Sequence, residues 1–250
     1  MTVAGFKDHF SKQAAEYAKF RPRYPKELFR WLASIAPSTE LAWDCATGNG
    51  QAAVELAEVF ERVIATDASE KQIVNAEKHP RVEYRVAPAE ESGLESNNVD
   101  LVMVAQALHW FDLERFYSEV RRVSKPHGVI AATSYKLAKI TPAIDRIVNH
   151  YYSEVVGPYW PAERMLVEKF EKLPFGFPEM ETPGFEMVAE WNAEQLLGYL
   201  RTWSATQRFM AANQRDPLRE VEEDLRAAWG DSEQLQRVTW PLTVRAGRLL

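Results

Sequence analysis

The sequence has little cysteine and no long apolar run. Cys45 is the only cysteine among 250 residues, which excludes a disulfide framework and predicts a reducing compartment. No apolar stretch approaches the roughly 18–20 residues that a membrane-spanning helix needs. The first residues mix charged and apolar side chains and do not show the core of a signal peptide. These absences predict a cytoplasmic protein without a membrane partner.

Basic residues are fewer than acidic residues in this sequence. There are 30 Lys and Arg against 36 Asp and Glu, a formal charge of -6. A nucleic-acid partner is therefore not expected, because phosphate-backbone binding needs a clustered basic face. The five histidines show no ligand spacing and there is no thiolate cluster, so no metal site is predicted. No feature of the sequence predicts an oligomeric state.

Short apolar runs alternate with helical patterns between residues 40 and 135. The runs 41–44, 62–67, 81–87, 99–105 and 129–134 are typical of strands, and 51–61, 69–78 and 112–123 are typical of helices. Residues 125–128 read as a turn. This order with short connections predicts an α/β fold with a doubly wound, mostly parallel sheet.

The remainder of the chain predicts additions to that sheet within one domain of residues 1–250. We expect N-terminal lid helices in 1–36, a cofactor-binding core in 40–135 and a mainly helical cap insertion in 137–215. Within the cap, 185–191 is a strand candidate and 193–203 a helix candidate. A C-terminal helix and an edge strand are expected in 216–250, because Pro241 cannot donate a hydrogen bond to a sheet ladder and so favours a sheet edge or a bulge.

A glycine-containing segment follows the first predicted strand. Gly48 and Gly50 allow a sharp turn and close approach to a ligand. The spacing Gly48-x-Gly50-x-x-Ala53, with Asp67 about 20 residues on, also fits a dinucleotide site and hence a nicotinamide-dependent oxidoreductase. Asp44 opposes that interpretation, because its carboxylate would repel a pyrophosphate. It suits the ammonium and sulfonium groups of S-adenosylmethionine (SAM).

Several segments carry a resemblance to a known family. Residues 44–50, DCATGNG, resemble the first motif of class I SAM-dependent methyltransferases, with Ala46 where many members have glycine. Residues 87–90 resemble the segment bordering the adenine, and 105–111 resemble the signature of the type 11 group. Residues 17–25, 198–204 and 238–241 resemble the trans-aconitate methyltransferase-like branch. The resemblance implies a seven-stranded Rossmann-like sheet with helices on both faces.

The resemblance also implies roles for individual residues. It implies SAM as cofactor, bound by Asp44, Ala46, Gly48, Gly50, Asp67, Ala68, Ala89, Glu90, Gln106, Tyr17 and Arg21. The expected substrate pocket contains Tyr24, His109, Trp110 and Trp203, with His109 as the candidate catalytic base.

The resulting hypothesis is methyl transfer from SAM to a small-molecule acceptor, a carboxylate or a hydroxyl. Two alternatives stay open at this point: a nicotinamide-dependent oxidoreductase and a non-catalytic SAM-binding protein.

Overall fold

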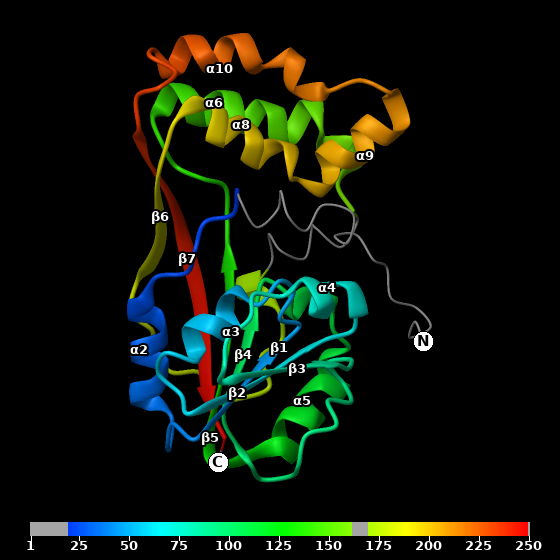
Figure 1. The fold of residues 1–250 in the computed structure, drawn as a ribbon, viewed down its shortest axis with the longest axis vertical. Coiled ribbons are helices and arrows are strands. Elements are labelled where there is room, and N and C mark those ends of the chain that lie inside the picture. The colour runs from blue at the N-terminus through cyan, green and yellow to red at the C-terminus, as the bar shows by residue number, and fades with distance from the viewer. Residues whose placement is uncertain (1–19, 162–169, 250) are drawn as a thin grey trace.

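The computed structural model describes residues 20–161 and 170–249. Its centre is a seven-stranded sheet in the order β3-β2-β1-β4-β5-β7-β6 (Figure 1). β7 runs antiparallel to both of its neighbours, and the other pairings are parallel. The strands are β1 (Leu41–Cys45), β2 (Arg62–Asp67), β3 (Val82–Val86), β4 (Val99–Ala105), β5 (Ser124–Tyr135), β6 (Phe185–Trp191) and β7 (Gln236–Arg248). The predicted mostly parallel, doubly wound sheet is confirmed.

Helices cover both faces of the parallel part of the sheet. Ala42 packs in one apolar cluster with α2 (Lys26–Ile35) and α3 (Gln51–Leu56). Its neighbour Trp43 points to the opposite face, in the cluster that contains α5 (Leu113–Val123). Burial on both faces explains why these strands read as continuous apolar runs rather than alternating ones.

Side-chain caps begin two of the predicted helices. Ser69 accepts a hydrogen bond from the Gln72 N–H at the start of α4 (Glu70–Asn75). Asp112 accepts one from the Arg115 N–H at the start of α5. Both caps satisfy backbone donors that a helix end otherwise leaves unpaired.

A group of helices lies beyond the carboxyl end of β5 and forms the cap (Figure 1). It comprises α6 (Pro142–His150), continued by the π-helical turn Tyr151–Val155 and the 3₁₀ turn Gly157–Tyr159, α8 (Ala193–Arg201), α9 (Ser204–Asn213), the 3₁₀ turn Pro217–Glu220 and α10 (Glu222–Trp229). α9 was not predicted. α10 packs against α6 and α8 and so belongs to the cap, not to a separate C-terminal part. Leu200 of the cap and Trp240 of β7 lie in the same apolar cluster as the α2 face of the sheet.

The expectation of an edge strand at the C-terminus is wrong. β7 lies between β5 and β6, and β6 is the edge strand. Pro241 is tolerated there because the pairing of β7 with β5 begins only at the next residue, Leu242, which lies opposite Tyr135. The ladder resumes on that side only at Thr239, which exchanges backbone hydrogen bonds with Lys139. The missing N–H therefore falls in a gap of the ladder.

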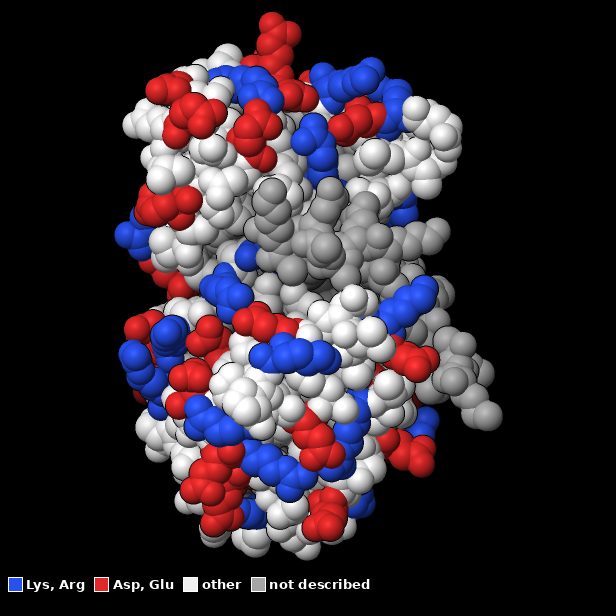
Figure 2. Space-filling model, viewed as in Figure 1, with Lys and Arg blue, Asp and Glu red and all other residues white. Residues whose placement is uncertain are grey.

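In the described part of the chain, the helices are all too short or too polar to cross a lipid bilayer. Figure 2 shows Lys and Arg side chains interspersed with Asp and Glu over the visible face.

Candidate active site

The glycine loop between β1 and α3 contains three residues with left-handed backbone. Ala46 has φ 56°, Gly48 φ 56° and Gly50 φ 84°, and Gly50 is the N-cap of α3. A left-handed alanine is strained, since only glycine adopts this region without steric cost. The structure therefore shows why a glycine is common at the position of Ala46 in the motif that it resembles.

Asp44 is completely buried at the end of β1, under this loop. Its Oδ2 accepts a hydrogen bond from the Thr47 hydroxyl at 2.5 Å. Its Oδ1 is buried and has no hydrogen-bond partner among the described residues. Burial raises the pKa of Asp44 to about 7; the hydrogen bond from Thr47 and, less strongly, the nearby backbone N–H of Ala53 oppose this effect, and the charge of Asp67 adds to it. An unpaired buried carboxylate oxygen is costly, and a cation placed beside it would remove that cost.

Asp67, at the end of β2, holds two loops together. One carboxylate oxygen accepts the Gly48 N–H at 2.9 Å and the other accepts the Ser69 N–H at 2.8 Å. Ala68 lies between Asp67 and the α4 cap. The two acids thus come from adjacent parallel strands and meet at the glycine loop, as the sequence predicts.

Tyr84 of β3 closes the outer side of the loop. A Cβ atom added to Gly50 would clash with the Tyr84 hydroxyl oxygen, so this position favours glycine for space as well as for its φ. The same hydroxyl donates to the Glu77 carbonyl. Glu77 in turn donates its N–H to the Asn49 carbonyl at 2.9 Å, which anchors the loop to the segment before β3.

Gln106 follows β4 with φ 60°, a strained value for a residue with a side chain. Its backbone N–H donates to the Thr133 carbonyl at 2.9 Å, and its Oε1 accepts from the Ser134 hydroxyl at 3.4 Å. Its Nε2 and the Thr133 Oγ1 are both buried without a hydrogen-bond partner in the described ranges. With Asp44 Oδ1, three unpaired polar atoms lie at the carboxyl ends of the adjacent strands β1, β4 and β5.

Arg21 and Tyr135 meet at the end of β5. The Arg21 guanidinium donates to the Tyr135 hydroxyl at 3.1 Å and lies 5.2 Å from the centre of the Tyr199 ring of α8. Trp203 is buried, and its ring packs edge-on against Tyr199 at 5.7 Å. Tyr199 thus lies between Trp203 and Arg21 in this chain of contacts.

The other candidate residues that the structure describes lie in two places. His109 and Trp110 lie in the 3₁₀ turn Leu108–Trp110 after β4, with ring centres 4.8 Å apart, and Trp110 is 38% exposed. Tyr24 is buried before α2, edge-on to Phe29. Tyr17 lies outside the described residues.

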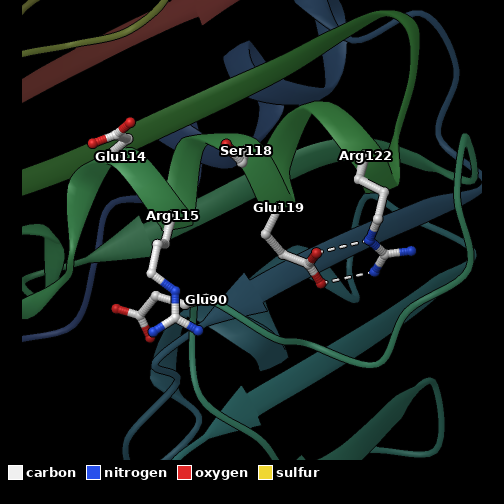
Figure 3. Close-up of a pocket in the computed structure, with 6 residues that line it drawn as sticks. All are labelled: Glu90, Glu114, Arg115, Ser118, Glu119 and Arg122. Atoms are coloured by element: carbon white, nitrogen blue, oxygen red, sulfur yellow. Dashed lines mark hydrogen bonds and ion pairs between the residues drawn. The ribbon is translucent and has the colours of Figure 1, made fainter.

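Ala89 and Glu90 follow β3 and diverge in direction. Ala89 is buried in the α5-side cluster. Glu90 accepts the Asp112 N–H at 3.0 Å, at the start of α5. It lines an open hollow of about 350 Å³ on the surface of α5, together with Arg115 and other polar residues (Figure 3). The structure thus places the Glu90 side chain at this helix end.

Thr47, Thr133, Tyr135 and Tyr199 were missed at the sequence level. A signal for two of them exists: Thr133 and Tyr135 come at the end of an apolar strand pattern, as Asp44 and Asp67 do. The rule that ligands bind beyond the carboxyl ends of parallel strands applies to β5 as it does to β1 and β2.

Comparison with known proteins shows the family of this chain. Residues 43–132 match the methyltransferase domain family of the type 11 group. A protein of Dictyostelium discoideum that carries a methyltransferase name is 36% identical over 250 residues, covering 96% of this chain and 95% of its own. A structure from Anaeromyxobacter dehalogenans, titled as a type II methyltransferase, is 49% identical, with a TM-score of 0.87 over 92% of this chain and 98% of that one.

A more distant structure, titled as a methyltransferase from an antibiotic biosynthesis pathway of Anabaena variabilis, is 20% identical. Its TM-score is 0.53 over 88% of this chain and 98% of that one, and it shows the shared fold alone. The full-length relative and the matched domain together show that this chain belongs to the class I SAM-dependent methyltransferases.

Proposed function

We propose that this protein binds SAM at the Asp44–Gly50 loop and transfers its methyl group to a small-molecule acceptor. The observation that supports this most strongly is the buried, unpaired Oδ1 of Asp44 beneath a left-handed glycine loop. A second acid, Asp67, lies beside it on the neighbouring strand.

The residues fit the chemistry of that cofactor. SAM carries an ammonium and a sulfonium, which suit a carboxylate in a buried setting, and ribose hydroxyls, which donate to an acid such as Asp67. A carboxylate has about four acceptor sites, so Asp67 can hold its two backbone N–H groups and still accept more. A pyrophosphate would bring negative charge to Asp44, which disfavours the nicotinamide alternative. That alternative depended on the glycine spacing, and membership of the methyltransferase family explains the same spacing.

The chemistry that SAM supplies when bound is an electrophilic methyl group; the protein supplies position and electrostatics. Alignment of the reactants can remove roughly 7–11 kcal/mol of the barrier. A carboxylate acceptor needs no base at neutral pH, because its pKa is about 4. A hydroxyl acceptor needs one, and His109 in the turn after β4 is our candidate. The resemblance to the trans-aconitate methyltransferase-like branch is a further ground for an oxygen acceptor.

Ligand binding by calorimetry and thermal shift tests the cofactor. S-adenosylhomocysteine (SAH) at a hundred times its Kd should stabilise the protein by about 2.7 kcal/mol. For a chain of this size that is about 5–11 °C in Tm. Asp67→Asn should weaken SAH binding at least tenfold. Asp231→Asn is the matched control, because Asp231 also accepts a backbone N–H, that of Glu233, but lies in a distant turn.

Absence of any SAH binding at millimolar concentration would contradict the proposal. If SAH binds but the protein, with labelled SAM and a panel of small acids and alcohols, labels none of them, the non-catalytic alternative is favoured instead.

A further inference from the structure

The end of β5 carries polar groups that the cofactor site does not account for. Thr133 is 1% exposed and its Oγ1 has no hydrogen-bond partner in the part of the chain that is described. Tyr135 lies two residues on, and alternate residues of a strand point to the same face. That face is the one on which Ala131, Met103 and Ala42 pack, and therefore also the face of Asp44. A buried, unpaired hydroxyl here indicates a missing ligand group, because buried polar atoms are rarely left without a partner.

The groups at this end of the sheet are suited to donating hydrogen bonds. The Tyr135 oxygen accepts from the Arg21 guanidinium, which leaves its own O–H to donate outward. Gln106 uses its amide oxygen to accept from Ser134, so that the buried Nε2 is left as a donor. Thr133 can also donate. The positive charge of Arg21 behind Tyr135 adds a preference for a negatively charged partner.

The strand register separates this group from Asp44. Asp44 is opposite Met103 of β4, and Met103 is opposite Ala131 of β5. Tyr135 is four residues beyond Ala131. Two strand spacings of about 5 Å and four residues of about 3.3 Å place the Cα atoms of Asp44 and Tyr135 roughly 16 Å apart. The ammonium and carboxylate of methionine share one carbon atom. A cofactor whose ammonium lies at Asp44 therefore keeps its own carboxylate near β1.

We propose that the end of β5 is the acceptor subsite, in which Tyr135 and Thr133 bind an anionic oxygen group of the substrate. Arg21 fixes the Tyr135 hydroxyl in place, and the Tyr199 ring forms an apolar wall beside it. The acceptor is then an acidic small molecule whose carboxylate or phosphate is held by hydroxyl donors. This inference rests on the proposed function, since it assigns the second half of the same site. The acids at β1 and β2 select a cation, and the hydroxyl donors at β5 select an anion.

Binding to the SAH-saturated protein tests this assignment with three probes of similar shape: benzoate, phenyl phosphate and neutral benzamide. We expect benzoate or phenyl phosphate to bind at least ten times more tightly than benzamide. Tyr135→Phe and Thr133→Val should each weaken that anion about tenfold and change the Kd of SAH by less than threefold. Tyr117→Phe is the matched control: it removes a tyrosine hydroxyl that donates to the Pro174 carbonyl on the α5 side of the sheet.

Three results would overturn the assignment while leaving the cofactor proposal intact. One is equal binding of benzamide and the anions, and another is binding of none of the three to protein that binds SAH. The third is that Tyr135→Phe or Thr133→Val weakens SAH itself, which would assign these hydroxyls to the cofactor. Failure of the wild-type protein to bind SAH would instead remove the proposed function and this inference with it. Thermal unfolding of each variant identifies loss of binding that is due to misfolding.

Discussion

Replacing Asp44 with asparagine should stabilise the protein while weakening its cofactor binding. Burial raises the pKa of Asp44 from 3.8 to about 7, which corresponds to about 4 kcal/mol against the ionised, folded form. Asparagine removes that cost and keeps an oxygen for the Thr47 hydroxyl, but its amide nitrogen takes the position of the unpaired Oδ1. A buried unpaired amide costs about 1–3 kcal/mol. The expected net gain in the free energy of unfolding at pH 8 is therefore about 1–3 kcal/mol.

The stability difference between Asp44→Asn and the wild type should depend on pH. Between about pH 4 and pH 7 the folded wild-type protein holds a proton that the unfolded chain has released, so its free energy of unfolding falls as pH rises through that range. Asp44→Asn lacks this titration. Its advantage over the wild type should therefore grow between pH 5 and pH 8, measured by denaturant unfolding of the ligand-free proteins.

SAH binding should change in the opposite direction. A bound ammonium requires the Asp44 carboxylate, so the affinity of the wild type for SAH should rise as pH increases through 7. Below pH 7, binding of SAH should release the proton of the Asp44 carboxyl group. Loss of a buried charged partner costs about 2–5 kcal/mol, so Asp44→Asn should weaken SAH by roughly 30-fold or more. Calorimetry in buffers of different ionisation enthalpy measures both the affinity and the proton release.

Glu119→Gln is the control with the opposite sign. Burial would raise the pKa of Glu119, but hydrogen bonds from Arg122 and Ser92 outweigh burial and lower it. Its carboxylate therefore stabilises the fold above the ordinary pKa, and Glu119→Gln should be less stable than the wild type at pH 8. The reasoning fails if Asp44→Asn is less stable than the wild type at pH 8, or if it binds SAH as tightly.

Two further predictions concern the glycine loop. Ala46→Gly should raise the free energy of unfolding by up to about 1 kcal/mol, because Ala46 has φ 56°, whereas Ala57→Gly should lower it, because Ala57 has an ordinary φ of -65°; denaturant midpoints measure both. Gly50→Ala should reduce stability and SAH affinity together, because its Cβ would meet the Tyr84 hydroxyl. Adding Tyr84→Phe should restore part of the loss; no recovery in the double variant would show that backbone strain alone is responsible.

Much of the cofactor half of the site could be predicted from the sequence because it is local. Asp44, Gly48 and Gly50 are close in the chain, and the carboxyl ends of two neighbouring parallel strands bring Asp67 to them. Such a site needs only the strand pattern and the glycine spacing.

The bulge near the start of β5 was not predictable in this way. Residues 125–128 read as a turn, but they belong to β5, with His127 at φ 63°.

The acceptor half depends on contacts between distant parts of the chain. Arg21 reaches Tyr135 across 114 positions of sequence, and Tyr199 comes to them from a helix of the cap. No local pattern specifies such pairs. Strand propensity also does not predict that a strand containing proline lies inside a sheet. Pro241 is accommodated because the hydrogen-bond ladder between β5 and β7 stops beside it.

The sequence by itself determined the alternation of strands and helices, the glycine turn and the acids at two strand ends, because periodicity and steric freedom act over a few residues. Only the tertiary structure decided that β7 lies inside the sheet, that α10 joins the cap, and that Thr133 and Tyr135 face the same side as Asp44. These outcomes depend on which surfaces pack together, and packing is a property of the whole folded chain.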